Sequence, residues 1–238
     1  MKEIYNLHNF IGNLSTAAKA DMEAEFSPIR EYAEGDCVYR VGDTAKEIHQ
    51  IVEGEIALCN YSIDGNEIII ARFLQGDCFG DLGLLDDEPR INTAISLGRC
   101  KLRSLSKINF DKLCKKHPEV MRQYSLMLSF RVRLLLDLVV DTNLLSLPER
   151  VARTIRRLSF SHGKKDEHNN LIIEMSHDEI AKFVAATRQS TSIELKNMEK
   201  TGSIEIKYGK IVIRDAQALD QVCSEYSSFA TITPVYRK

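Results

Sequence analysis

Arg188 and Gln189 are adjacent residues whose side chains can read the edges of base pairs. A guanidinium can donate two parallel hydrogen bonds to guanine O6 and N7, and a glutamine amide can pair with N6 and N7 of adenine. Both residues follow Thr187, a good helix N-cap, so we expect them in the first turn of a helix. A major groove about 12 Å wide admits one helix, whose positive N-terminal end favours nearby phosphate. Because polar residues on a helix face are usually only solvated, this chemistry needs support from the neighbouring elements.

The residues around this pair predict two short helices joined by a tight turn. Residues 176–179, Ser-His-Asp-Glu, have the form of a capping box, so a helix is expected to start there. Three residues, 185–187, then separate this helix from the second one. On the second helix Thr191, Leu195 and Met198 fall on one inner stripe, which leaves the polar residues on its outer face.

A hairpin is expected directly after the second helix. Gly202 ends that helix, and residues 204–213 alternate around a Tyr-Gly turn, so they would lie as a wing beside the two helices. The residues predicted to contact DNA lie at the helix starts, on the outer face of the second helix and on the wing: Ser176, Thr187, Arg188, Gln189, Ser190, Ser192, Lys196, Lys207 and Lys210. Among these residues, Arg188 is expected to read a guanine.

The charge along the chain is uneven. The 238 residues carry 32 Lys+Arg and 34 Asp+Glu, for a net charge of -2. Residues 1–146 hold a net charge of -5, whereas residues 147–238 hold +3, which favours an anionic partner for the second half. With 44% apolar and 28% charged residues, the composition is that of a globular protein and excludes the collagen-like and disordered classes.

Two further segments precede this half. Residues 28–106 consist of short apolar runs rich in β-branched residues and punctuated by glycines, which predicts an all-β barrel or roll. The gaps between the runs are too short for crossover helices, so a parallel α/β sheet is excluded. Residues 119–145 lack Gly and Pro and predict one long helix. Aliphatic residues from 134 to 140 surround it on nearly every side, which predicts burial on two sides, as in a symmetric dimer seam.

The order of these motifs, from about Gly35 to Val222, resembles the cyclic-AMP receptor protein and fumarate-nitrate reductase regulator (Crp/Fnr) family of bacterial transcription factors. In the first half the resemblance is carried by residues 35–36, 42–43, 51–54, 65, 76–81, 89–90 and 93–94, and in the second half by residues 179–181, 187–190, 194–196, 202 and 209–211. It implies an α+β fold with a jelly-roll-like β-roll of the cyclic-nucleotide-binding type, a dimerisation helix and a winged helix-turn-helix.

The resemblance also implies an organisation and a function. We expect a β-roll sensor domain at residues 1–117, a dimerisation helix and hinge at 118–146, a winged helix-turn-helix at 147–222 and a tail at 223–238. The implied function is that of a homodimeric transcription regulator that binds a pseudo-palindromic operator on double-stranded DNA, with RNA polymerase as a further partner. Activation and repression are both compatible with the sequence.

The same resemblance implies an effector pocket in the roll. In relatives that bind cyclic AMP, the segment matching residues 79–91 holds the cyclic phosphate with backbone amides and an arginine, and a glutamate takes the ribose hydroxyl. The implied pocket residues are Gly80, Asp81, Leu82, Arg90 and Ile91, with Leu135 and Leu136 from the long helix. Arg90 is kept, but Asp81 is one methylene shorter than the glutamate, Ile91 replaces a serine, and the adenine-contacting Thr-Ser pair falls at the two leucines. Since each unsatisfied polar group costs about 1 to 3 kcal/mol, we expect an effector other than cyclic AMP in the usual mode.

The sequence does not identify a cofactor. An iron-sulphur cluster would need a cysteine cluster near the N-terminus, and no residue before Cys37 supplies one. A haem would need an axial ligand such as His49, Cys59 or Cys78, but a single such residue on a strand is far more often part of the core. No metal site is predicted either. The identity of the effector stays open, with a small molecule or cysteine redox chemistry as the candidates.

Two other classes of function fit the sequence less well. A cyclic-nucleotide-binding module that acts on a protein partner is the alternative, although such a module needs neither the Arg188-Gln189 helix nor the wing. An enzyme is the weakest hypothesis, because the dense polar triplet at 177–179 is better explained by helix capping. The opening segment lacks the apolar run of a signal peptide and the six cysteines form no C-x-x-C pair, so a cytoplasmic protein without a membrane span is expected.

Overall fold

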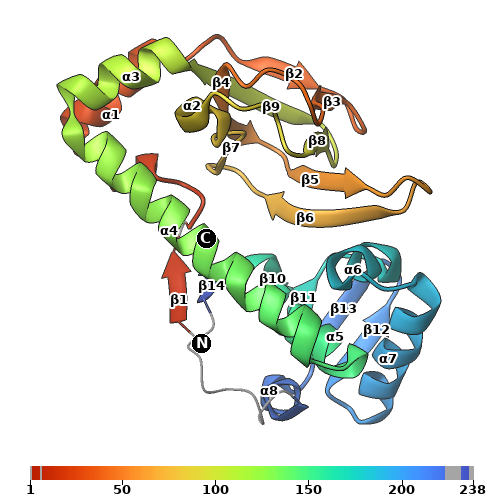
Figure 1. The fold of residues 1–238 in the computed structure, drawn as a ribbon. Coiled ribbons are helices and arrows are strands. Elements are labelled where there is room, and N and C mark those ends of the chain that lie inside the picture. The colour runs from red at the N-terminus through yellow and green to blue at the C-terminus, as the bar shows by residue number, and fades with distance from the viewer. Residues whose placement is uncertain (1, 6, 223–231, 236–238) are drawn as a thin grey trace. The chain divides into compact units, whose positions relative to one another are not determined.

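The computed structural model describes residues 2–5, 7–222 and 232–235. The chain divides into two compact units, Asn6–Arg131 and Met1–Tyr5 with Val132–Lys238 (Figure 1). This division falls inside the long helix, whereas the sequence suggests divisions at the two ends of that helix. The predicted α+β class is confirmed. Among the described residues, no helix combines the length and the apolar character that crossing a membrane requires.

The first unit is built around two four-stranded antiparallel sheets, with strand orders β2-β9-β4-β7 and β3-β8-β5-β6. The strands are β2 (Arg30–Tyr32), β3 (Cys37–Tyr39), β4 (Glu47–Glu53), β5 (Ile56–Tyr61), β6 (Glu67–Phe73), β7 (Cys78–Phe79), β8 (Thr93–Ser96) and β9 (Cys100–Ser106). Only the short helix α2 (Gly83–Asp86) interrupts them, so the all-β prediction for residues 28–106 is confirmed in its main point.

Helices that the sequence analysis missed close one end of this roll. They are α1 (Thr16–Glu25) and α3 (Lys107–Lys116), together with the 3-10 turn η1 (Ile11–Asn13). Their core includes Phe10, Phe110 and Tyr124, whose rings pack edge to face, with centroids of the last two 5.2 Å apart. Tyr124 belongs to the helix α4 (Pro118–Leu144), so the first half of α4 is packed into the roll.

The second half of α4 presents an apolar face. Its exposed residues are Val132, Leu135, Leu136, Val139, Val140 and Leu144, with exposed fractions from 39% to 59%. The helix itself was predicted at residues 119–145 and is found at 118–144. Burial of this face on two sides stays a prediction, since it requires a partner surface.

The second unit contains the remaining elements. They are α5 (Leu147–Ser161), β10 (Gly163–Lys165), β11 (Leu171–Ile173), α6 (His177–Val184), α7 (Arg188–Lys200), β12 (Ile204–Lys207), β13 (Lys210–Ile213) and α8 (Ala216–Val222). The four strands form a sheet in the order β10-β11-β13-β12, and Val151, Ile155, Ile180, Leu195 and Ile211 lie fully buried in the core between it and the helices. β10 lies in a polar stretch and has only three residues.

A second, smaller sheet joins the two ends of the chain. β1 (Lys2–Tyr5) pairs in parallel with β14 (Ile232–Val235), in the register of Lys2 with Ile232 and Tyr5 with Val235. Of the predicted tail at 223–238, residues 223–231 and 236–238 lie outside the described residues, so its role stays open.

Candidate nucleic-acid interface and effector pocket

One N-cap residue sets the start of each of the two short helices, Ser176 for α6 and Thr187 for α7. At α6 the backbone N–H of Ser176 donates to Glu179 Oε2 (2.8 Å), and the N–H of Glu179 donates back to Ser176 Oγ (3.2 Å). At α7 the N–H of Ser190 donates to Thr187 Oγ1 (3.1 Å). Between them Ala185 takes a left-handed conformation (φ 51°), which turns the chain sharply. The helix, three-residue turn and second helix predicted from the sequence are all present.

The two faces of α7 differ as the sequence indicates. Thr191, Leu195 and Met198 are buried, whereas Arg188 and Gln189 are exposed on the opposite side of the first turn. Lys196 is exposed as well, and Ser190, Ser192 and Ser176 are half-buried. The buried stripe fixes the rotation of α7 about its axis, so the guanidinium and the amide are presented to solvent at the N-terminal end, where the helix dipole is positive.

His177 is the first residue of α6 and lies inside the capping box of that helix. Its Nδ1 lies 3.0 Å from Ser192 Oγ, so a hydrogen bond joins α6 to α7. Partial burial, and then the charges of Arg188 and Lys196, lower the pKa of His177. The ring is therefore neutral at pH 7, and it helps to hold the two helices at a fixed angle.

The wing is a hairpin of β12 and β13 whose turn is Tyr208-Gly209. Gly209 has φ +66°, a conformation that favours glycine, and Tyr208 is fully exposed at the tip. Lys207 and Lys210 face each other across the strands. Lys207 is exposed and its Nζ lies 3.4 Å from Glu205 Oε1, while Lys210 is half-buried. The charge of Lys207 is thus shared with an acidic neighbour.

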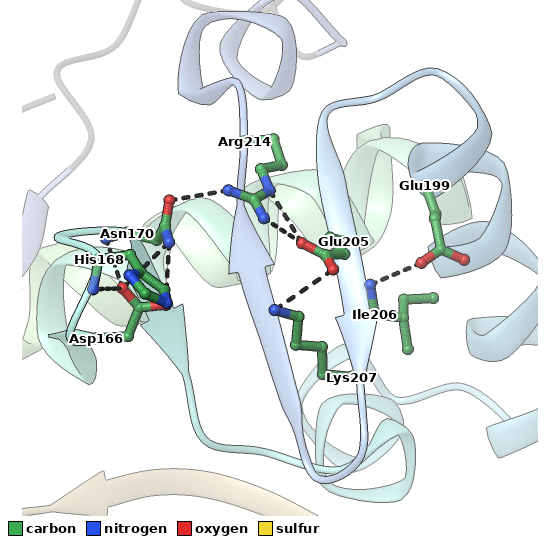
Figure 2. Close-up of polar contacts among 8 residues, drawn as sticks. All are labelled: Asp166, His168, Asn170, Glu199, Glu205, Ile206, Lys207 and Arg214. Carbon is green, nitrogen blue, oxygen red and sulfur yellow. Dashed lines mark hydrogen bonds and ion pairs between the residues drawn. The ribbon is translucent and has the colours of Figure 1, made fainter.

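Figure 2 shows how the wing is attached to the rest of the unit. Glu199 Oε1, from α7, accepts a hydrogen bond from the backbone N–H of Ile206 on β12 (2.7 Å). Arg214 donates through Nε to Glu205 Oε2 (3.0 Å) and through Nη1 to Asn170 Oδ1 (2.8 Å). The hydrogen bond from Arg214 is the main cause of the lowered pKa of Glu205.

Asn170 is itself held in the β10–β11 connection. Its backbone N–H and its side-chain amide both donate to Asp166 Oδ1, at 2.8 and 3.1 Å. Sequence reasoning missed these anchoring residues because their partners lie 7, 9 and 44 residues away for Glu199, Glu205 and Asn170 respectively. No local spacing signals such contacts.

In the first unit, Arg90 is turned inward. It is 7% exposed, its Nη2 donates to the carbonyl of Glu47 (2.7 Å), and its Nη1 donates to the carbonyl of Gly80. The guanidinium carbon lies 4.3 Å from the centroid of the Tyr39 ring. Burial lowers the pKa of Arg90. The residue that would hold a cyclic phosphate is thus engaged by backbone carbonyls and an aromatic face.

Asp81 is engaged as well. It is 3% exposed, and Arg131 Nη1 lies 2.7 and 2.8 Å from its two carboxylate oxygens. Arg131 also donates through Nη2 to the carbonyl of Cys78 (2.6 Å) and through Nε to His8 Nδ1 (3.1 Å). Burial alone would lower the pKa of Arg131, but the ion pair with Asp81 outweighs it and the pKa is raised. Tyr124 completes the arrangement by donating to the carbonyl of Asp81 (2.9 Å).

The other predicted pocket residues are placed differently. Leu82 and Ile91 are 45% and 59% exposed on the first unit, on either side of the segment that contains α2. Leu135 and Leu136 are exposed on the part of α4 that belongs to the second unit. Within the first unit the structure brings Gly80 and Arg90 into direct contact. Among the described residues, no cluster of three or more His, Cys, Asp or Glu side chains could hold a metal ion.

Two family models match separate parts of the chain. A model described as a cyclic nucleotide-binding domain matches residues 29–117, and a model described as a Crp-like helix-turn-helix domain matches residues 149–222. The chain is 22% identical over 220 residues to the CRP-like cAMP-activated global transcriptional regulator of Mycobacterium tuberculosis, covering 92% of this chain and 98% of that protein. It is 26% identical over 188 residues to the cAMP-activated global transcriptional regulator Vfr of Pseudomonas aeruginosa, covering 77% and 87%.

Solved structures show the same fold. The c-di-GMP responsive global regulator CLP of Xanthomonas campestris matches with a TM-score of 0.74 at 20% identity, covering 84% of this chain and 99% of that one. FixK2 of Bradyrhizobium japonicum matches with a TM-score of 0.70 at 20% identity, covering 82% and 96%. At 20% identity, what these two matches show is the fold.

Proposed function

Because the chain belongs to the Crp/Fnr family of transcription regulators, which are DNA-binding proteins and not enzymes, we propose that it acts as a homodimer on a pseudo-palindromic operator. The observation that carries the proposal is the placement of Arg188 and Gln189, exposed at the N-terminal end of α7 and backed by a buried inner stripe. A recognition helix contacts base edges with its N-terminal residues while the preceding helix crosses the DNA backbone.

Each predicted contact residue has a role in this proposal. Arg188 reads a guanine and Gln189 an adjacent base, both in the major groove. The other residues contact phosphate or neighbouring base edges from the helix N-termini, the outer face of α7 and the wing: Ser176, Thr187, Ser190, Ser192, Lys196, Lys207 and Lys210. Phosphate contacts of this kind fix register, whereas Arg188 supplies specificity.

The dimer is supported by the apolar face on the second half of α4. A second copy of the same helix would cover Leu135, Leu136 and Val139 in an isologous contact. Two recognition helices about 34 to 36 Å apart could then enter successive major grooves. RNA polymerase is proposed as a partner on the family resemblance alone, and the four-part organisation at 1–117, 118–146, 147–222 and 223–238 is proposed with it.

The effector is proposed to be a small molecule other than cyclic AMP in the usual mode. Two of the relatives above are named as cAMP-activated and one as c-di-GMP responsive, so the family does not share one ligand. Here Asp81 is bonded to Arg131, and Arg90 to the carbonyls of Gly80 and Glu47. A cyclic nucleotide would therefore compete with buried contacts for the Asp81 carboxylate and for both terminal nitrogens of Arg90.

Binding-site selection with the purified protein, followed by mobility-shift titration, tests the DNA-binding proposal. Arg188→Ala should weaken binding by about 1 to 3 kcal/mol and abolish the preference for one G·C pair in each half-site. Lys200→Ala, in the last turn of the same helix, is the matched control and should keep that preference. An unchanged base preference in Arg188→Ala would refute the assigned role.

The salt dependence of DNA affinity distinguishes this proposal from the alternative, a module that acts on a protein partner. Phosphate contacts make the affinity for DNA fall steeply between about 50 and 200 mM salt, because condensed counterions are released on binding. A protein-docking module would show no such binding at either concentration. Calorimetry against cyclic AMP tests the effector proposal, and tight binding to the native protein would contradict it.

A further inference from the structure

The joint between α4 and α5 is short and closed by side chains. Only Leu145 and Ser146 separate the two helices, and Leu145 is 4% exposed. The N–H and Oγ of Ser146 both donate to Glu149 Oε2, at 2.7 and 2.5 Å, which fixes the first turn of α5. Arg150 Nη1 donates to the carbonyl of Leu145 (3.2 Å), so α5 also caps the end of α4.

A buried carboxylate on α4 lies against two arginines of α5. Asp141, one turn before the end of α4, is 4% exposed. Arg153 Nη1 lies 3.1 Å from its Oδ1, and Arg157 Nη1 donates to its Oδ2. Arg157 is 8% exposed, and its Nε and Nη2 have no hydrogen-bond partner within the part of the chain that the structure describes. We call Asp141, Arg153 and Arg157 the elbow clasp.

The charges of the elbow clasp favour one arrangement of the two helices. Arg153 and Arg157 are four residues apart on the same helix face, so they repel each other when no carboxylate lies between them. Asp141 lies near the C-terminal end of α4, where a negative charge is disfavoured by the helix dipole. The contacts of Asp141 with Arg153 and Arg157 join the two helices, so they exist only when α4 and α5 keep their present angle.

A plain stabilising salt bridge explains these observations less well. Buried ion pairs add little net stability compared with apolar residues, whereas removing one partner leaves an uncompensated charge. Such a pair is therefore a better device for selecting one geometry than for strengthening a contact. The unit boundary agrees with this, because residues from Val132 onward group with the DNA-binding elements.

We propose that the elbow clasp makes Asp141 a positioning residue for operator binding. It holds the helix-turn-helix at a fixed angle to the second half of α4, and hence sets one separation between the two recognition helices of a dimer. When these contacts are made, the residues between α4 and α5 are held in one arrangement. This inference rests on the proposed dimeric DNA-binding function.

The test measures affinity for operators in which the two selected half-sites are moved apart or together by two base pairs. A dimer that cannot engage both half-sites loses its avidity, so native protein should bind the displaced operators about 100-fold more weakly. In Asp141→Asn the penalty should fall below about tenfold. Because this variant leaves Arg157 buried without its carboxylate, the double variant Asp141→Asn with Arg157→Gln is measured too, and the same relaxed spacing is expected.

The matched control is Asp220→Asn. Asp220 pairs with Arg156 of the same helix α5 at 2.9 Å and is 52% exposed, so the same chemical change is made away from the elbow. It should keep the native spacing preference. A loss of affinity that is equal for all spacings in both clasp variants, with the native spacing ratio unchanged, would overturn the inference. Absence of any spacing dependence in the native protein would instead overturn the proposed function on which it rests.

Discussion

The ion pair between Arg131 and Asp81 gives a prediction whose size follows from the structure. Replacing Arg131 by Met leaves Asp81, 3% exposed, without its cation, and leaves the carbonyl of Cys78 without its donor. Breaking a buried pair by removing one partner costs about 3 to 5 kcal/mol, and the unbonded carbonyl adds about 1 kcal/mol. For a unit of this size each kcal/mol lowers the melting temperature by about 4 °C, so a decrease of about 15 to 25 °C is expected.

Urea denaturation and calorimetry of the full chain measure this effect, with the transition of the first unit followed separately. Arg133→Met is the matched control, because Arg133 is exposed two residues further along α4 and its replacement should change stability by less than about 0.5 kcal/mol. The double variant Arg131→Met with Asp81→Leu should recover to within about 2 kcal/mol of the native protein, since apolar residues can replace a buried ion pair. A loss below about 1 kcal/mol in Arg131→Met would refute the reasoning and return Asp81 to the list of groups available to an effector.

Three further predictions concern the helix-turn-helix. Ala185→Gly should stabilise the second unit by about 1 kcal/mol in urea denaturation, because an exposed alanine there holds a left-handed conformation that glycine adopts freely; a destabilised variant would contradict this. Thr191→Val should stabilise it by up to about 1 kcal/mol, since the fully buried Thr191 hydroxyl has no hydrogen-bond partner among the described residues; thermal unfolding measures it, and a lower midpoint would show that the hydroxyl is bonded. The lowered pKa of His177 means that the folded state favours the neutral ring, so stability should fall as the pH drops below about 6.5 and through the folded-state pKa. In His177→Gln the loss between pH 7.5 and 5 should be smaller than in the native protein, and an equal loss would assign it to other groups.

Local signals in the sequence were sufficient for the helix-turn-helix. Ser176 and Thr187 are N-caps, the connection has three residues, and the stripe through Leu195 has helical spacing, so each element is specified by neighbours within four residues. The strands of the roll were found for the same reason, through glycine turns and β-branched runs. Helix α4 was predicted within one residue at each end.

Elements without strong local periodicity were missed. Ser15 and Ser106 cap α1 and α3, and this signal is present in the sequence, but both helices are short and are stabilised by packing on a core that comes from distant segments. β10 has only three residues in a polar stretch, and it forms because β11 offers it an edge.

The candidate sites divide in the same way. Exposure of Arg188 follows from helix periodicity, so it could be predicted. The inward turn of Arg90 and the pairing of Asp81 with Arg131 could not, because those partners lie 10 and 50 residues apart and only the folded roll brings them together. The contact of Asp141 with Arg157 likewise depends on the angle between two helices, which no sequence pattern specifies.

The parallel pairing of β1 with β14 has a consequence for the order in which the elements fold during synthesis. Residues 232–235 leave the ribosome about 230 residues after residues 2–5, so β1 waits for its partner strand while the segment between them is synthesised. At about 5 to 20 residues per second this wait is about 10 to 50 s, during which the roll and the intervening helices can fold as they emerge. Closure of this strand pair therefore has to wait for residues 232–235, and nascent chains that stop short of residue 232 fold their other elements without it.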